Sequence, residues 1–370
     1  MSSDLAFPAP ESERRDRFAG LAWLLDPPLQ TADLPGIGGR LRMCPEDFTV
    51  HELPAYGPDG RTGAHLLLTL RKRGIGTEDA IVEVARQTGI PRPDIGLAGL
   101  KDKDAVTEQW ISVPFAAGPK LAVFSHPAIT LGEATPHGNK LRRGHLHGNR
   151  FTLVVRELAT SGDEARTRVA AKLARITELG GLDNLYGNQR LGSDGGNLRR
   201  GLELLASGAR RGRADFLLSA GQSALFNLYL LERRTRGLLR TVLAGDILKK
   251  TATGGLFECT DPAVDQARLD SGELGVTGPM FGSKMRAPAP GTAAAALEQE
   301  ILDQVGISPE ALKALGNKVE GTRRPLKLPQ IPLQTEPVSA SDTLPPGLRL
   351  HFALPPGSYA TVLLQELQGP

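Results

Sequence analysis

Residues 98–107 read Ala-Gly-Leu-Lys-Asp-Lys-Asp-Ala-Val-Thr, a polar segment that separates two short apolar runs, 95–98 and 109–113. Runs of this length are typical of strands, so we expect the polar segment to form the turn between them. A carboxylate at the tip of such a turn, here Asp102, is positioned to meet a ligand. Charged turns are also the commonest surface feature of proteins, and the residues alone favour that second interpretation.

A metal site in this segment is disfavoured by its charges. Asp102 and Asp104 are flanked by Lys101 and Lys103, whose ammonium groups would repel a cation. We therefore expect no metal ion here.

The chain on both sides of the segment is predicted to be β-rich, with two helices. Thr77 is expected to cap a helix that Gly89 follows, and Ser161 to open a second that ends at Gly180 and Gly181. Apolar alternation predicts strands over residues 47–53, 65–70, 151–155 and 348–353.

Residues 181–330 differ in composition and are predicted to be mostly helical. Leu198, Leu202 and Leu205 share one helical stripe, and Asp261-Pro262 and Ser308-Pro309 each resemble an N-cap followed by proline at the first helical position. A β-rich beginning and end around a helical middle predict an inserted domain, because the two β-rich ends need each other to complete a sheet.

The overall composition is that of a globular protein of more than one domain, since 370 residues exceed the usual size of a single core. Cys44 and Cys259 are far apart and predict neither a disulfide framework nor a zinc site. No run approaches the roughly 18 apolar residues of a membrane helix. We expect a cytoplasmic protein without a membrane partner.

Two basic segments are candidates for contact with a polyanion. The first, residues 140–150, contains four cationic residues and no acidic one, and a solvated loop explains it equally well. The second, residues 190–240, contains ten arginines against four acidic residues and no lysine, which favours phosphate binding, because arginine suits bidentate phosphate contacts. The candidate RNA-binding residues are Lys140, Arg142, Arg143, Arg190, Arg199, Arg200, Arg210 and Arg211.

Motifs of other enzyme classes are absent from the sequence. There is no GxGxxG, GxxxxGK[ST] or GxSxG pattern, and residues 192–196 are better interpreted as the beginning of a helix than as a phosphate loop. A small-molecule enzyme acting on nucleotides therefore has little support.

Taken together, several segments resemble the tRNA pseudouridine synthase D (TruD) family. They occur in the family's order across roughly residues 40–367, whereas no such segment is recognised in the first forty residues. Leu191 departs from the family's usual phenylalanine, and Gly221-Gln222 departs from its usual pattern. The matching segments are 45–48, 98–103, 105–107, 109–110, 148–151, 184–190, 219–220, 223–227, 321–324 and 354–361.

The resemblance implies an α+β fold: a pseudouridine synthase catalytic domain with a largely antiparallel mixed sheet and an inserted, mainly helical TRUD domain. The expected division is a lead-in (1–39), the catalytic domain in two parts (40–180 and 331–370) and the insertion (181–330). The implied substrate is the uridine at position 13 of tRNA. The implied reaction needs no cofactor, because it involves no net oxidation or group transfer.

The resemblance also assigns roles within the site. Asp102 is the implied catalytic carboxylate, acting either as nucleophile at the sugar C1′ or as base on the way to a glycal intermediate. Arg42 is its expected cationic partner, and Phe48 or Phe151 should receive the displaced base. Asn149 should hydrogen-bond Asp102 or the base edge, and Ser358 and Tyr359 should line the cleft.

An RNA-binding protein with an inactive pocket is the remaining alternative. Such a protein would retain the arginines but would usually lose the catalytic aspartate, and Asp102 is present. The sequence indicates no obligate protein partner.

Overall fold

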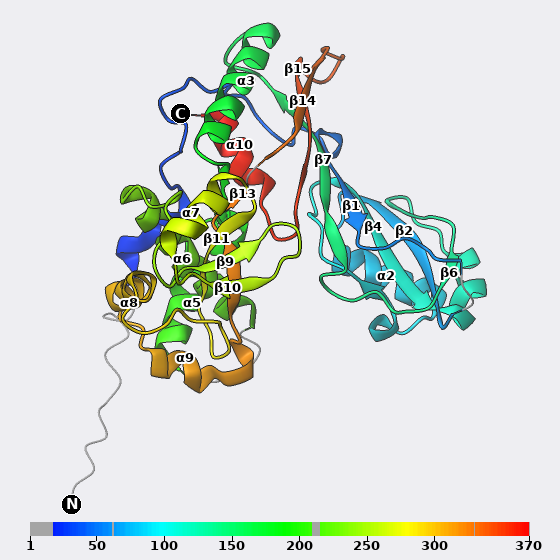
Figure 1. Ribbon diagram of the computed structural model, residues 1–370. Helices are drawn as coiled ribbons and strands as arrows, with labels where there is room; N and C mark the ends of the chain where they lie inside the picture. The colour runs from blue at the N-terminus through cyan, green and yellow to red at the C-terminus, as the bar shows by residue number, and fades with distance from the viewer. Residues whose placement is uncertain (1–17, 61–62, 209–214, 329, 370) are drawn as a thin grey trace, which may run out of the picture. The chain divides into compact units, whose positions relative to one another are not determined.

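The computed structural model describes residues 18–60, 63–208, 215–328 and 330–369, which form two compact units (Figure 1). Unit 1 comprises the described residues up to Gln30 together with Ile176–Pro329, and unit 2 comprises Thr31–Arg175 together with Gln330–Pro370. Within the described ranges, no helix is long and apolar enough to cross a membrane.

Unit 2 is built on one sheet, to which nine strands of the described chain belong. The strand order is β14-β15-β7-β1-β4-β2-β5, with β3 paired to β4 and β6 paired to β2. The strands are β1 (Phe48–Pro54), β2 (His65–Arg73), β3 (Gly96–Leu97), β4 (Val106–Pro114), β5 (Ile129–Leu131), β6 (Thr135–His137), β7 (Leu146–Arg156), β14 (Leu333–Val338) and β15 (Gly347–Leu354).

The sheet is mixed but largely antiparallel, since β1 and β4 pair in parallel and the other pairs among these described strands run antiparallel. Strands from both ends of the chain meet at its centre, where β15 lies beside β7 and β7 beside β1. This arrangement confirms the expected α+β fold class and explains why the last strand is needed to complete the sheet.

Helix α2 (Thr77–Thr88) covers one face of β2 and β4. Its residues Ile81 and Val84 pack against the alternate residues Leu68 and Leu70 of β2, all of them fully buried. Gly89 ends the helix in the left-handed conformation, as the sequence predicts. The N-cap is Gly76 rather than Thr77, so that prediction is wrong: Thr77 is the first helical residue, and its hydroxyl bonds elsewhere.

The remaining helices of unit 2 are α3 (Gly162–Glu178), which continues past Arg175 into unit 1, and α10 (Ala360–Gln368). Within unit 2 they are linked through Thr31, whose hydroxyl donates to Glu366 at 2.7 Å and whose carbonyl accepts from the buried Lys172 at 3.0 Å. Short 3-10 helices complete the unit: η2 (Pro45–Asp47), η3 (Arg92–Asp94) and η4 (Phe115–Val123).

Unit 1 contains helices and also two small sheets, so the expectation of a mainly helical insertion is too simple. The larger sheet has the order β10-β9-β11-β12, and β13 pairs with β8. The helices and strands of unit 1 are η1 (Ala19–Leu25), β8 (Leu182–Asp183), α4 (Asn188–Leu191), α5 (Gly196–Ser207), α6 (Asp215–Thr235), β9 (Ile247–Lys250), β10 (Leu256–Glu258), α7 (Pro262–Asp270), β11 (Leu274–Met280), α8 (Ala293–Val305), α9 (Pro309–Leu315), η5 (Gly316–Lys318), β12 (Thr322–Pro325) and β13 (Lys327–Leu328).

Helices α5 and α6 of unit 1 pack closely through two glycines. A Cβ atom on Gly201 would lie 2.5 Å from the backbone nitrogen of Gly221, and one on Gly221 would lie 2.6 Å from the carbonyl carbon of Gly201. The predicted stripe Leu198, Leu202 and Leu205 is fully buried in α5. Gly221, which departs from the family pattern, is therefore a packing requirement of this protein.

The interpretation of residues 1–39 as a loosely packed lead-in is wrong for its described part. Phe18 and Leu24 are buried, and the residues between them form η1 within unit 1. Ile37 is buried within unit 2. The unit boundaries fall after Gln30, Arg175 and Pro329 rather than after residues 39, 180 and 330. The first boundary comes earlier than expected because Ile37 already belongs to the core of unit 2.

Candidate active site

The candidate site lies on the face of the unit 2 sheet that α2 covers in part. Residues opposite one another on neighbouring strands project to the same face, so the register places side chains from five strands in one row. That row contains Lys72 (β2), Thr107 (β4), Val50 (β1), Phe151 (β7) and Phe352 (β15). Glu52 and Asn149 form the neighbouring pair on β1 and β7.

Buried side chains hold the polar turn of residues 98–105 through hydrogen bonds to its backbone. The Nε2 of Gln109 donates to the carbonyl of Gly99 at 3.0 Å, and the backbone nitrogen of Lys101 donates to the Thr77 hydroxyl at 2.9 Å. That hydroxyl donates in turn to Oε1 of Gln109 at 2.9 Å. These bonds satisfy the backbone of the turn internally, which is unlike a loop that is held by solvent alone.

A buried ion pair anchors the residue next to Asp102. The ammonium of Lys101 lies 2.5 Å from Oε2 of Glu52, and both side chains are almost completely buried. The other oxygen of Glu52 accepts from the backbone nitrogen of Trp110 at 3.2 Å. Lys103 and Asp104, by contrast, are exposed. The turn therefore directs some of its charged residues inward and others outward.

The carboxylate of Asp102 remains accessible and contacts the predicted cation. Its Oδ2 accepts from Nη2 of Arg42 at 3.1 Å, and its side chain is 34% exposed. The guanidinium carbon of Arg42 lies 4.0 Å from the centroid of the Phe48 ring. Arg42 adopts a left-handed backbone with a φ of 59°, which costs on the order of 1 kcal/mol for a residue with a Cβ.

A second cation contacts the main chain of Asp102. The ammonium of Lys72 donates to the main-chain carbonyl of Asp102 at 2.5 Å, and the residue is 1% exposed. Burial lowers the pKa of Lys72 to about 8, although the negative charge of Asp102 acts in the other direction. The sequence did not predict a role in the site for Lys72, Glu52 and Gln109, because charged and polar residues on a strand resemble a solvated face. Nor did it predict one for Thr77, which was expected only to cap a helix.

The aromatic candidates form a chain of ring contacts across β1, β7 and β15. Phe151 meets Phe48 edge to face at 6.4 Å and stacks on Phe352 at 5.2 Å. Phe48 is fully buried, and Arg42 covers its ring, so it is not available as a surface for a base. Phe151 retains a small exposed fraction, 7%.

Asn149 and the turn after β15 lie along the same edge. The Oδ1 atom of Asn149 is buried and has no hydrogen-bond partner among the described residues. Gly148 packs so closely that an added Cβ would lie 2.3 Å from the carbonyl oxygen of Leu354, the register partner of Asn149. Ser358 and Tyr359 follow Leu354 and are half-buried.

The first basic segment lies beside the polar turn of residues 98–105. The backbone nitrogen of Gly144 donates to the carbonyl of Ala98 at 2.9 Å, which places this loop against the segment 98–105. Arg142 and Arg143 are exposed, whereas the ammonium of Lys140 donates to the carbonyl of Pro93.

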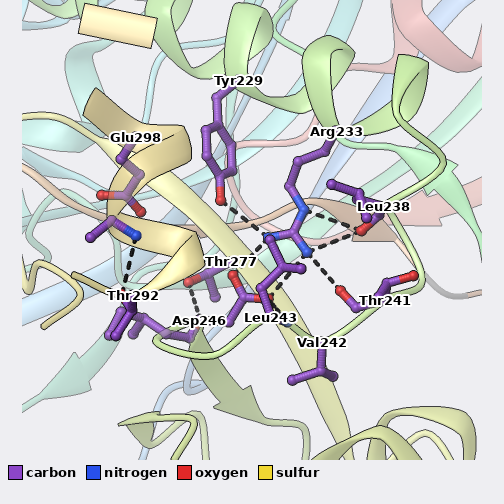
Figure 2. Close-up of polar contacts among 12 residues, drawn as sticks. Tyr229, Arg233, Leu238, Thr241, Val242, Leu243, Asp246, Thr277, Thr292 and Glu298 are labelled. Carbon is purple, nitrogen blue, oxygen red and sulfur yellow. Dashed lines mark hydrogen bonds and ion pairs between the residues drawn. The ribbon is translucent and has the colours of Figure 1, made fainter. Parts of the chain in front are cut away.

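Several arginines of the second basic segment are structural, which corrects the surface interpretation of the whole segment. Arg233 is buried and pairs with Asp246 at 2.6 Å, and Figure 2 shows its guanidinium enclosed by Tyr229, Asp246 and the carbonyls of Leu238 and Thr241. Arg234 pairs with Asp183 at 2.9 Å. The partners Asp246 and Asp183 lie outside residues 190–240.

The other candidates in this segment differ in their surroundings. Arg190 donates to the Ser219 hydroxyl at 2.5 Å and lies over Phe216. Arg199 is half-buried and Arg200 is exposed on α5. Arg210 and Arg211 lie outside the described residues. In the ranges that the structure describes, no group of three or more His, Cys, Asp or Glu side chains is arranged to hold a metal ion.

Comparison with known proteins agrees with this fold. A curated relative from Anaeromyxobacter dehalogenans (strain 2CP-C), tRNA pseudouridine synthase D, is 46% identical over 355 residues, which cover 93% of this chain and 97% of the relative. A protein of the same name from Thermus thermophilus is 41% identical over 344 residues, 92% of this chain and 91% of the relative.

A solved structure and a family model extend the comparison. The crystal structure of a putative tRNA pseudouridine synthase D from Methanosarcina mazei superposes with a TM-score of 0.70 at 21% identity, covering 93% of this chain and 96% of that one, and shows the same fold. The family model of tRNA pseudouridine synthase D (TruD) matches residues 26–208 and 212–367. This chain therefore belongs to the tRNA pseudouridine synthase D (TruD) family.

Proposed function

We propose that this protein isomerises the uridine at position 13 of tRNA to pseudouridine, with Asp102 as the catalytic carboxylate. The observation that carries the proposal is the accessible Asp102 carboxylate, held by Arg42 on a turn that buried side chains fix from below. Family membership supports the reaction class, and a cytoplasmic location suits a tRNA substrate.

The reaction requires an ionised carboxylate next to the sugar. The carboxylate either attacks C1′ of the target nucleotide or removes a sugar proton on the way to a glycal, and in both routes the glycosidic bond to N1 of uracil breaks. The detached base turns and rejoins the sugar through C5, N1 gains a proton, and the proton on C5 is released to solvent. Arg42 fixes the orientation of the Asp102 carboxylate through their 3.1 Å contact and places a positive charge beside it.

Two residues of the sheet face are proposed to hold the base while it turns. The Oδ1 of Asn149 is a buried acceptor without a partner among the described residues, which suits the N3–H donor of uracil. Phe151 offers the remaining aromatic surface, because Arg42 already covers Phe48. Ser358 and Tyr359, in the turn after β15, are proposed to line the same cleft.

The proposed RNA-binding residues fall in both units. Arg142 and Arg143 are exposed on the loop beside the catalytic turn, and Arg200 is exposed on α5. Phosphate contacts by such side chains would supply affinity without reading the sequence of the RNA.

The proposal is tested with a tRNA transcript that carries tritium at C5 of its uridines. We expect stoichiometric release of one tritium per tRNA, and no release from the same transcript with cytidine at position 13. Release that persists from the cytidine-13 transcript would contradict the assigned position. Release from neither transcript would contradict the activity.

A further inference from the structure

Lys72 occupies a position where the strand pattern requires an apolar residue. On β2 the alternate residues Leu66, Leu68 and Leu70 face the core beneath α2, and Lys72 continues the same face. It is 1% exposed. Burying an ammonium costs free energy unless it is compensated, so a lysine here needs a reason that packing does not supply.

The surroundings of Lys72 are charged on one side only. Its ammonium donates to the main-chain carbonyl of Asp102, and the charged side chains that act on it all belong to the catalytic turn: Asp102, Lys101 and Asp104. Its register partners on β4 and β5 are Thr107 and Ile129, both uncharged. The positive charge of Lys72 is therefore directed at the residue that carries the proposed nucleophile.

A neutral donor would suffice if the turn only had to be held in place. Gln109 and Thr77 already perform that task for Gly99 and Lys101 with uncharged groups. The charge itself must therefore contribute. When tRNA fills the site, water leaves the Asp102 carboxylate, so a fixed positive charge close to the carboxylate acts on it more strongly. The field of a buried ammonium is screened less by solvent than that of the partly exposed Arg42.

We propose that Lys72 is a positioning residue for the reaction: its buried ammonium fixes the Asp102 peptide and places, close to the Asp102 carboxylate, a positive charge that solvent screens little in the tRNA complex. This inference rests on the proposed function. It adds a second cation to the Arg42–Asp102 pair.

The pH dependence of activity and of stability should then have opposite signs. The pKa of Lys72 is about 8 in the folded protein and near its usual value of 10.5 in the unfolded chain. Between these values the unfolded chain binds the additional proton, so the contribution of Lys72 to the free energy of unfolding rises with pH. Over the same range the folded protein loses the ammonium, so the reaction should slow down.

The experiment compares the wild type with Lys72→Met, Lys72→Arg and the exposed control Lys103→Met. Single-turnover rates at saturating tRNA are measured from about pH 6 to pH 10, together with tRNA affinity and thermal unfolding. We expect a wild-type rate that falls with a midpoint near pH 8, and a Lys72→Met rate at pH 7 that is about 10- to 100-fold lower and lacks this alkaline fall. Lys72→Arg should recover much of the rate and move the fall to higher pH, and Lys103→Met should behave like the wild type.

Stability separates this role from a structural one. Lys72→Met should be at least as stable as the wild type at pH 7 and bind tRNA equally well, and the difference in stability should shrink as the pH rises past about 8. A Lys72→Met protein with the wild-type rate and alkaline fall would overturn the inference. So would a variant that unfolds or loses tRNA affinity and is not rescued by arginine. A wild type without activity would instead contradict the proposed function and this inference with it.

Discussion

Nη2 of Arg42 lies 3.1 Å from Oδ2 of Asp102, a contact between residues that are 60 positions apart in the chain. Arg42 reaches this position from a left-handed backbone and packs its guanidinium on the ring of Phe48. A backbone conformation that costs free energy and persists at a polar contact of this kind indicates a functional constraint. The pair is the most direct structural support for Asp102 as the catalytic group.

Arg42→Ala should slow single-turnover pseudouridine formation by about 10- to 100-fold while tRNA still binds, because the carboxylate remains but loses its cation and its orientation. The rate of Arg42→Lys should lie between those of the wild type and Arg42→Ala, since lysine keeps the positive charge but lacks the planar guanidinium. The matched control is Arg40→Ala, whose side chain is 69% exposed and pairs with Glu157 at 3.4 Å. Equal rates for Arg42→Ala and Arg40→Ala would show that the Asp102 contact is dispensable.

Arg199→Ala combined with Arg200→Ala should weaken tRNA binding and flatten its salt dependence. Each lost phosphate contact should lower the slope of log affinity against log salt by roughly one unit. Filter binding over a range of salt concentrations measures this slope. Arg236→Ala is the control, because Arg236 already pairs with Glu232 and Glu300. An unchanged slope in the double variant would indicate that tRNA binds at Arg142 and Arg143 instead of at α5.

Arg233→Met should destabilise the protein rather than its RNA contacts. Arg233 is fully buried, and its removal leaves the carboxylate of Asp246 without its cation (Figure 2). Breaking a buried pair in this way costs about 3–5 kcal/mol, whereas the partly exposed pairs of Arg236 contribute about 0–1 kcal/mol. Urea unfolding of Arg233→Met and Arg236→Ala compares the two. Similar stabilities for the two variants would mean that the Arg233 network is not a stabilising element.

The sequence predicts the local elements of the fold well, because periodicity and capping are local signals. The strands over 47–53 and 65–70, the left-handed Gly89 and the caps at Asp261 and Ser308 all occur as predicted. The strands of unit 1 were not predicted. Most of them have only two to four residues, which carry little periodicity, but β11, with seven residues, was missed as well.

The buried polar residues that hold the turn of residues 98–105 could not be predicted, because their role depends on the strand register. Lys72 and Glu52 reach the turn only because β4 lies between β2 and β1 with Thr107 opposite both Lys72 and Val50. Arg233 was wrongly interpreted as part of a surface for phosphate, because its partner Asp246 lies outside the basic segment 190–240. Charge counts along a chain do not show which charges neutralise one another in space.

Asp102→Asn tests most directly whether the Asp102 carboxylate performs the chemistry. The substitution keeps the shape and most of the hydrogen-bonding capacity but removes the charge and the nucleophile. Asp104→Asn, in an exposed position of the same turn, is the matched control. The measurement is single-turnover tritium release from tRNA labelled at C5 of uridine, with filter binding on the same samples. We predict that Asp102→Asn binds tRNA with nearly wild-type affinity and releases no tritium, while Asp104→Asn retains substantial activity; an Asp102→Asn protein that releases tritium at a near wild-type rate would contradict the catalytic assignment.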